Sequence, residues 1–120
     1  MRGKMGSLQT YKDGQAAEVK AMLYLLLKGY WPLARRFKTP VGEIDIITRR
    51  GRTLVFVEVK KRANHDTAAA SIGPENAARV RRAAEWWLKS HTAVADKCDI
   101  RFDAVTVADY CHIKHIPNAF

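Results

Sequence analysis

Residues 54–60 place the tightest limit on how this chain can fold. Three valines alternate there with Phe56, Glu58 and Lys60, and residues two apart share one face of a β-strand. The pattern predicts a central strand whose valines face one way. On the opposite face a carboxylate and an ammonium stand side by side, and such groups are rarely buried without a reason. The alternative is an ion pair near the end of the sheet, which contributes little to stability.

The other elements predict an α/β fold. Helix-forming residues from Gly14 onward end before Gly29, which favours a helix stop. After Pro74, apolar residues recur at i, i+3, i+4, i+7 and i+8, which predicts an amphipathic helix. Strands are predicted over residues 33–39, 44–47, 54–60 and 100–107, with an optional edge strand over 111–116. The predicted order is helix, three strands, helix and strand.

The composition predicts one globular domain. The 120 residues are 48% apolar and 28% charged, the balance of an ordinary globular chain. We assign residues 14–120 to this domain and residues 1–13 to a loose N-terminal segment. No apolar run approaches the ~20 residues that a bilayer requires, and no signal-peptide order is present. Cys98 and Cys111 fit free thiols, so we expect a cytoplasmic protein with no membrane span.

The net charge points to a polyanionic partner. Lys and Arg total 21 against 12 Asp and Glu, which gives a formal net charge of +9. So basic a surface on so small a domain favours nucleic acid or an anionic membrane face. The alternative is a charge that only keeps the protein in solution.

Asp45 adds a second carboxylate one hairpin before Glu58. The loop at residues 48–53 lets the two strands pair antiparallel, so Asp45 is expected to lie near Glu58. Two carboxylates at short range repel, and a divalent cation between them relieves that repulsion. Mg²⁺ accepts one or two carboxylates together with water and phosphate oxygens. Lys60 could then orient or deprotonate the attacking water, or neutralise charge on phosphate, so the three residues form a coherent set for phosphodiester hydrolysis.

Glu18 on the first predicted helix is a further candidate. It shares a stripe with apolar residues at i+3, i+4 and i+7, so it is expected to face the sheet. The alternative is a surface glutamate just outside the core. Glu43 points the same way as Asp45 by strand alternation, and it is either a supporting residue or a solvated one.

These motifs resemble the YraN-like family of uncharacterised bacterial proteins. The matching positions are Gly14, Glu18, Ala21, residues 42–45, residues 57–60 with Arg62, residues 101–103 and residues 116–120. The family is similar in fold to the PD-(D/E)xK nuclease superfamily, and archaeal Holliday-junction resolvases look like its nearest functional relatives. The resemblance implies a restriction-endonuclease-like core of order α-β-β-β-α-β, with a mixed central sheet flanked by helices. It also implies Mg²⁺-dependent cleavage of DNA.

The same resemblance implies a role for individual residues. Glu18 matches the helix glutamate, Asp45 the strand aspartate, and Glu58 with Lys60 the E-x-K pair. Asp45 and Glu58 would then bind Mg²⁺ or Mn²⁺. The chain departs from the family at Asn76, where a lysine is frequent near the start of the second helix. If that lysine assists the substrate phosphate, its replacement weakens the catalytic interpretation.

Six side chains are candidates for contacting nucleic acid: Arg36, Arg62, Arg79, Arg82, Trp86 and Lys89. The last four form one stripe on the second predicted helix. Basic groups contact phosphates, and an exposed tryptophan can stack on an unpaired base. The alternative is that the basic residues only solvate the helix while the tryptophan covers the edge of the core.

Three functions therefore remain open. The leading prediction is a metal-dependent endonuclease that cleaves branched or single-stranded DNA. The second is a non-catalytic nucleic-acid-binding module in recombination, repair or DNA uptake, which the basic charge supports equally well. The third is a protein-interaction subunit, such as a homodimer, that uses Trp86, Trp87 or the sheet edge.

Overall fold

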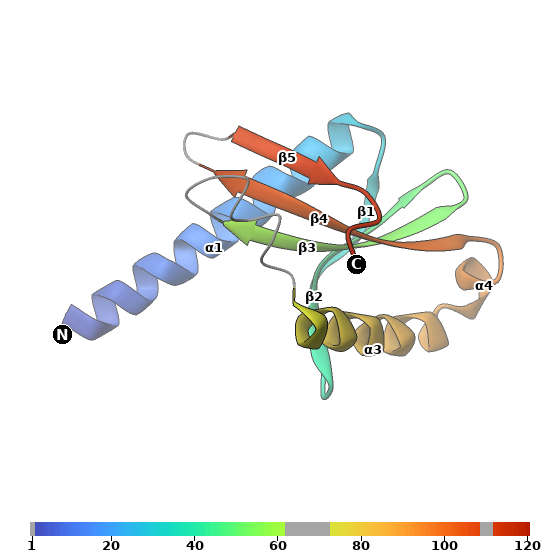
Figure 1. The fold of residues 1–120 in the computed structure, drawn as a ribbon, viewed down its shortest axis with the longest axis horizontal. Coiled ribbons are helices and arrows are strands. Elements are labelled where there is room, and N and C mark those ends of the chain that lie inside the picture. Colours follow the sequence, from blue (N-terminus) through green and yellow to red (C-terminus); the bar gives the residue numbers. More distant parts are fainter. Residues whose placement is uncertain (1, 62–72, 109–111) are drawn as a thin grey trace.

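The computed structural model describes residues 2–61, 73–108 and 112–120, with backbone alone for residues 2–14. Its helices and strands follow the predicted order, and one short helix is added after the second long one (Figure 1). The elements are α1 (Arg2–Leu27), β1 (Trp31–Thr39), β2 (Gly42–Arg50), β3 (Thr53–Lys61), α3 (Pro74–Ser90), α4 (Thr92–Ala95), β4 (Asp99–Ala108) and β5 (His112–Ile116). The optional edge strand is therefore confirmed as β5.

The strands form one mixed sheet in the order β1-β2-β3-β4-β5. Neighbours pair antiparallel except β3 and β4, which run parallel. A parallel pair needs a crossover connection, and α3 lies in that connection. The predicted α/β class with a mixed sheet is confirmed.

Two hydrophobic layers lie on opposite faces of the sheet. One packs α1 against the valines of β3, with Ala21 and Leu25 fully buried. The other packs α3 against Leu54 and Phe56 of the same strand, with Trp87 in edge-to-face contact with Phe56. The central position predicted for residues 54–60 is confirmed, because both faces of β3 are covered.

Helix α1 begins earlier than the sequence predicts. We expect a loose segment over residues 1–13, whereas the backbone is helical from Arg2. The early residues include helix formers and no proline, and extending an existing helix costs far less than starting one. The packed half of α1 therefore propagates backwards, and its N-terminal half projects beyond the sheet (Figure 1). No helix among the described residues is long and apolar enough to cross a membrane.

The regular alternation of side chains is interrupted in the β1–β2 hairpin. Ile44 and Ile47 both pack on the α3 side, while Ile46 packs on the α1 side. A regular strand would place Ile44 and Ile47 on opposite faces. The interruption falls at Asp45, which lies across the hairpin from Arg36 between two flanking pairs. Arg36 has a φ of 56°, a left-handed conformation that costs a non-glycine residue about 1–2 kcal/mol.

A buried polar network joins β4 to the C-terminal segment. Asp103 is fully buried and accepts hydrogen bonds from Arg101 at 2.7 and 2.8 Å and from Asn118 N at 2.9 Å. His115 Nε2 lies 2.6 Å from Asp103 Oδ2. The Lys28 ammonium lies 2.7 Å from His115 Nδ1; because an ammonium only donates, the His115 proton belongs on Nε2, facing Asp103. The network anchors β5 and the chain end to the sheet.

Candidate active site

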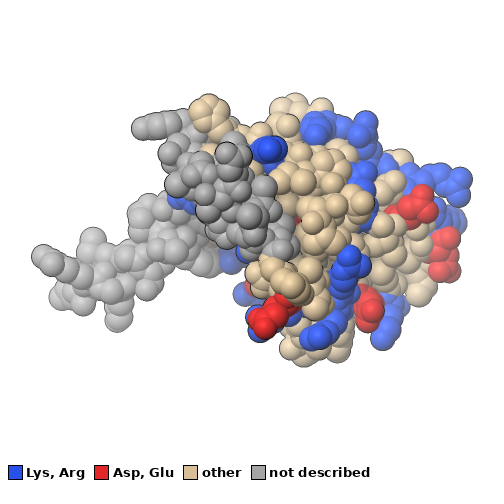
Figure 2. Space-filling model, viewed as in Figure 1, with Lys and Arg blue, Asp and Glu red and all other residues tan. Residues whose placement is uncertain are grey.

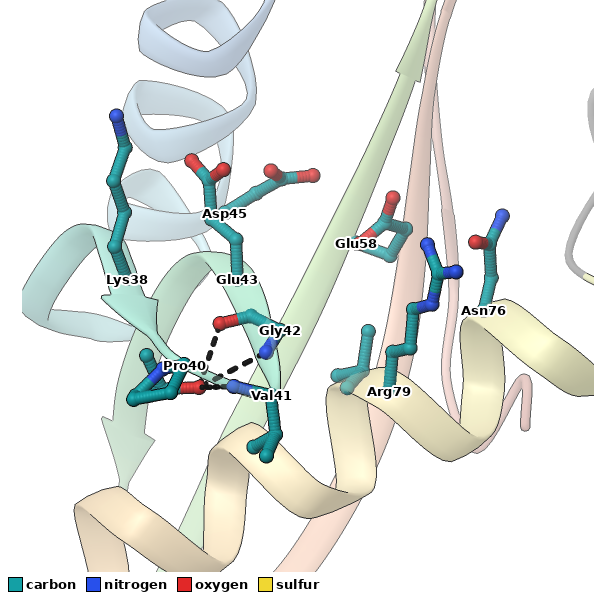
Figure 3. Close-up of a pocket in the computed structure, with 11 residues that line it drawn as sticks. Lys38, Pro40, Val41, Gly42, Glu43, Asp45, Glu58, Asn76 and Arg79 are labelled. Atoms are coloured by element: carbon teal, nitrogen blue, oxygen red, sulfur yellow. Dashed lines mark hydrogen bonds between the residues drawn. The ribbon is translucent and has the colours of Figure 1, made fainter.

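A cavity of about 710 Å³ lies between the β1–β2 hairpin and α3 (Figure 3). The hairpin contributes residues 38–43 and Asp45, β3 contributes Glu58, and α3 contributes Asn76, Arg79 and Val80. Two predicted site residues, Asp45 and Glu58, therefore share one opening. Lys38 and Arg79 add positive charge to its walls.

Asp45 stands where strands β2 and β3 begin to separate. The last paired residues are Ile46 and Val57, so continuing that register places Asp45 opposite Glu58. Asp45 Oδ2 instead accepts a hydrogen bond of 2.7 Å from the Val59 backbone N–H. This bond spans the gap between the strands and fixes the carboxylate at the mouth of the fork.

The Asp45 carboxyl is held in a surrounding that opposes its ionisation. Burial and the neighbouring Glu58 carboxylate raise its pKa to about 8, with smaller contributions from Glu18 and Glu43, against a lowering by the Val59 N–H. An acid this strongly perturbed in a cavity marks a candidate functional group. The predicted repulsion between the two carboxylates is therefore present in the fold.

Lys60 lies beside Glu58 as the strand period predicts. Its Nζ is 3.2 Å from Glu58 Oε1, and the two side chains keep only 16% and 15% of their exposure. The pair lies near the end of β3, as the alternative interpretation expects, but little of either side chain is exposed to solvent. Lys60 thus places a positive charge directly beside one of the site's carboxylates.

Glu18 reaches the same region from α1. Its Oε2 atom is buried without a hydrogen-bond partner, although the Arg36 Nε lies 3.7 Å away. Burial raises the pKa of Glu18, Arg36 opposes the rise, and Glu43 and Glu58 add to it. The prediction that Glu18 faces the sheet is therefore supported by its burial and by its interaction with Glu58.

Arg36, a predicted nucleic-acid contact, lies between two carboxylates of the site. Its Nε lies 3.7 Å from Glu18 and 3.9 Å from Glu43. Its left-handed backbone stands directly across from Asp45. Backbone strain of this kind persists where the surrounding structure over-determines it, and it collects at functional sites.

The donor set suits a hard divalent cation. In the part of the chain that the structure describes, no three His, Cys, Asp or Glu side chains converge into a preformed metal site. Asp45 and Glu58 would therefore hold the ion together with water and phosphate oxygens, as Mg²⁺ prefers. A positive charge at this point would favour the ionised form of Asp45 and would give a partner to the buried Glu18 Oε2, which has no hydrogen bond.

The remaining predicted contacts divide into three groups. Arg79 lines the cavity, while Arg82, Trp86 and Lys89 are exposed further along α3, with Trp86 at 50%. Arg62 lies outside the described residues. Asn76, where the resemblance leads us to expect a lysine, also lines the cavity. A lysine there would face the carboxylates, so the amide lowers the positive charge of this wall.

The sequence did not predict that the turn between β1 and β2 forms one wall of the site. Pro40 and Val41 line the cavity and are exposed. Thr39 Oγ1 holds the turn by donating to the Gly42 carbonyl at 2.7 Å and accepting from two backbone N–H groups. The signal for a turn, Pro40 with Gly42, was visible, but its place beside α3 depends on tertiary packing.

Gly42 allows the hairpin to touch α3. A Cβ at this position would lie 2.7 Å from the Arg79 carbonyl oxygen, which real Cβ atoms essentially never do. We expect Gly42→Ala to push the hairpin away from the helix and to lower the free energy of unfolding by roughly 1–3 kcal/mol. Chemical denaturation measures this change. Gly73→Ala is the matched control, because nothing lies within 4 Å of its Cβ, and equal stability of the two variants would contradict the close contact.

The family model and the individual relatives that match this chain name the same family. The model of the uncharacterised protein family UPF0102 matches residues 17–107. A UPF0102 protein of Methylorubrum extorquens is 53% identical over 111 residues, which cover 92% of this chain and 86% of the relative. Relatives from Rhodopseudomonas palustris strain BisB18 and Bradyrhizobium diazoefficiens are 46% and 43% identical, each over 92% of this chain and over 81% and 82% of their own lengths. The matched region includes every residue of the candidate site.

Proposed function

The chain belongs to the uncharacterised protein family UPF0102, and on that premise we propose that it is a metal-dependent DNA endonuclease. Membership confirms the YraN-like resemblance seen in the sequence. The nuclease proposal goes further and rests on the site itself. The observation that carries it is the facing of Asp45 and Glu58 at the fork of two strands, with Lys60 3.2 Å from Glu58.

Each residue has a chemical task in this proposal. A bound Mg²⁺ or Mn²⁺ supplies Lewis-acid polarisation and a more acidic water. Asp45 and Glu58 provide the carboxylate oxygens for that ion. Lys60 orients or deprotonates the attacking water, or neutralises charge that develops on the phosphate. Glu18 completes the acidic surroundings, and Arg36 keeps it in place at 3.7 Å.

The fold is compatible with a nuclease core. The elements follow the order α-β-β-β-α-β of the PD-(D/E)xK superfamily, with the acidic residues on β2 and β3 and a glutamate on α1. We therefore propose the restriction-endonuclease-like architecture as part of the same inference. A fold hosts many activities, so the site carries the functional proposal and the fold only agrees with it.

The surface favours DNA as the substrate. Basic side chains project from the region of α3, with single acidic side chains between them (Figure 2). The exposed residues Arg79, Arg82 and Lys89 extend along α3 from the cavity. Phosphate contacts of this kind give salt-dependent binding without sequence preference. The stripe would hold the strand while the carboxylates act on one phosphate.

Cleavage assays test the proposal directly. With Mg²⁺ or Mn²⁺, we expect the wild type to cut forked, flapped or single-stranded DNA. Lys60→Met removes the ammonium and keeps most of the apolar stem, and it is expected to lower kcat by roughly 10²–10⁴-fold. Lys97→Met is the matched control, since Lys97 is exposed in the turn before β4.

The assay separates the two nucleic-acid functions. Salt-sensitive DNA binding without cleavage by the wild type would favour the non-catalytic binding module, because the α3 stripe acts without the carboxylates. Cleavage that survives Lys60→Met with an unchanged kcat would contradict the assigned role of Lys60.

A further inference from the structure

The cavity has two chemically different walls. The α3 wall carries Arg79 and Asn76, whereas the hairpin turn presents Pro40 and Val41 (Figure 3). Val41 keeps 38% of its exposure, which makes it one of the large apolar side chains on the surface. An apolar wall cannot bind phosphate, so what it can contact in a nucleic acid is a base or a sugar.

The turn is rigid enough to act as a fixed surface. Thr39 Oγ1 makes three short hydrogen bonds within it, of 2.7, 3.0 and 3.2 Å. Gly42 then seats the turn against the Arg79 carbonyl, where even a methyl group would not fit. A side chain that packs on the end of a base stack must keep its position when it meets the stack, and these contacts hold Val41 in place.

The charges beside the turn favour DNA over an apolar partner. Lys38 on β1 and Arg79 on α3 line the same cavity as Val41. An apolar protein surface that covered Val41 would also bury these two cations without partners, which is costly. A nucleic acid offers phosphates to the cations and a base face to Val41.

We propose that the Pro40–Val41 turn packs against the exposed face of a base where a base-paired stack ends. Val41 comes directly before β2 and precedes Asp45 by four residues, which span at most about 13 Å of extended chain. The base therefore lies a few nucleotides from the phosphate at Asp45 and Glu58. The substrate is therefore DNA with a branch or a duplex–single-strand junction, and continuous duplex is excluded by its unbroken stack. Apolar side chains that unstack bases in other proteins act in the same way. This inference rests on the proposed nuclease function.

A stacking probe tests the inference without cleavage. Forked DNA carries 2-aminopurine in the last base pair before the branch, and binding is measured in EDTA. The wild type is expected to raise the fluorescence roughly twofold, because Val41 takes the place of the unpaired base that stacks on the probe in free DNA. Val41→Ser should leave the fluorescence near that of free DNA, while its salt-dependent affinity stays within about twofold because the phosphate contacts remain.

Leu33→Ser is the matched control. Leu33 lies on β1, the strand that leads into the turn. Its side chain is 41% exposed, close to the 38% of Val41, and does not line the cavity. It is expected to behave as the wild type. Thermal melts check that both variants are folded, and a Val41→Ser fluorescence rise equal to that of the wild type overturns the inference.

Cleavage of forked against continuous duplex DNA gives a second measurement. The wild type is expected to prefer the fork by roughly tenfold in kcat/KM, and Val41→Ser to lose most of that preference. Equal cutting of both substrates by the wild type overturns the inference and leaves the nuclease proposal intact. A stacking signal that depends on Val41, with no cleavage of any DNA, supports the inference and counts against the nuclease proposal.

Discussion

Replacing Asp45 by Asn is expected to make the metal-free protein more stable at pH 8 and to abolish metal binding and cleavage. The pKa of Asp45 lies near 8, against an ordinary value of 3.8. Between these values the folded state keeps a proton that the unfolded chain releases. The free energy of unfolding therefore falls as the pH rises from about 4 to about 8.

Asn removes this cost while it keeps an acceptor for the Val59 N–H. At pH 4 the wild-type carboxyl is protonated in the fold and about half protonated in the unfolded chain, so wild type and variant should unfold at similar denaturant concentrations. At pH 8 the variant should be more stable by on the order of a few kcal/mol, because each unit of pKa shift corresponds to about 1.4 kcal/mol. Denaturant titrations at both pH values in EDTA measure the difference.

Metal addition should reverse the order of stability of the wild type and Asp45→Asn. Mn²⁺ at pH 8 is expected to raise the melting temperature of the wild type and to leave Asp45→Asn unchanged, since an ion that binds only the folded state stabilises it. Calorimetry should find the Mn²⁺ site in the wild type and not in the variant, and DNA cleavage should be lost with it. Asp96→Asn, an exposed carboxylate, serves as control. A variant that still binds Mn²⁺, or that gains no stability at pH 8, would refute the assignment.

The second large effect is expected at Asp103, which belongs to the buried polar network of β4 and does not line the cavity. Asp103→Asn leaves the Arg101 guanidinium in its network without the carboxylate that takes two of its hydrogen bonds. Breaking a buried pair from one side costs about 3–5 kcal/mol, which lowers the melting temperature by roughly 10–20 °C in a chain of this size. Asp99→Asn is the control, because Asp99 is an exposed aspartate at the start of the same strand.

The pH dependence of this network has the opposite sign from that of Asp45. Burial raises the pKa of Asp103, but hydrogen bonds from His115, Arg101 and the Asn118 backbone outweigh it and lower the pKa to about 2. The unfolded chain therefore binds the proton first, and the stabilisation is lost as the pH falls from about 4 to about 2. Acid unfolding followed by circular dichroism should show this loss in the wild type and a weaker one in Asp103→Asn. Parallel acid curves would mean that Asp103 does not carry the stabilisation.

Several features followed from the sequence because they are local. The alternation in residues 54–60 predicts two buried faces and a carboxylate beside an ammonium, and the structure has both. The hairpin before it predicts that Asp45 faces Glu58. Period, turn residues and helix stops depend on neighbours in the chain, and this is why the order of elements and the core of the site could be predicted.

Other features depend on segments that only packing brings together. The start of α1 at Arg2 follows from cooperative extension of a helix that is fixed elsewhere. The side chains of β2 stop alternating between the two sheet faces at Asp45, where Arg36 lies across the hairpin in a left-handed conformation. A periodic sequence pattern cannot predict such an irregularity. The Asp103 network joins Lys28, which directly follows α1, to β4, β5 and the chain end.

The sequence by itself determined that Asp45, Glu58 and Lys60 form the candidate site, since the strand period and one hairpin bring them together. The tertiary structure alone decided how strongly they are perturbed. Three features arise where segments distant in the chain meet. Asp45 is buried and its pKa rises to about 8, Glu18 keeps a buried oxygen without a hydrogen bond, and Gly42 packs against α3. The physical reason is that side-chain direction is a property of local backbone geometry, whereas desolvation and charge proximity are properties of the packed whole.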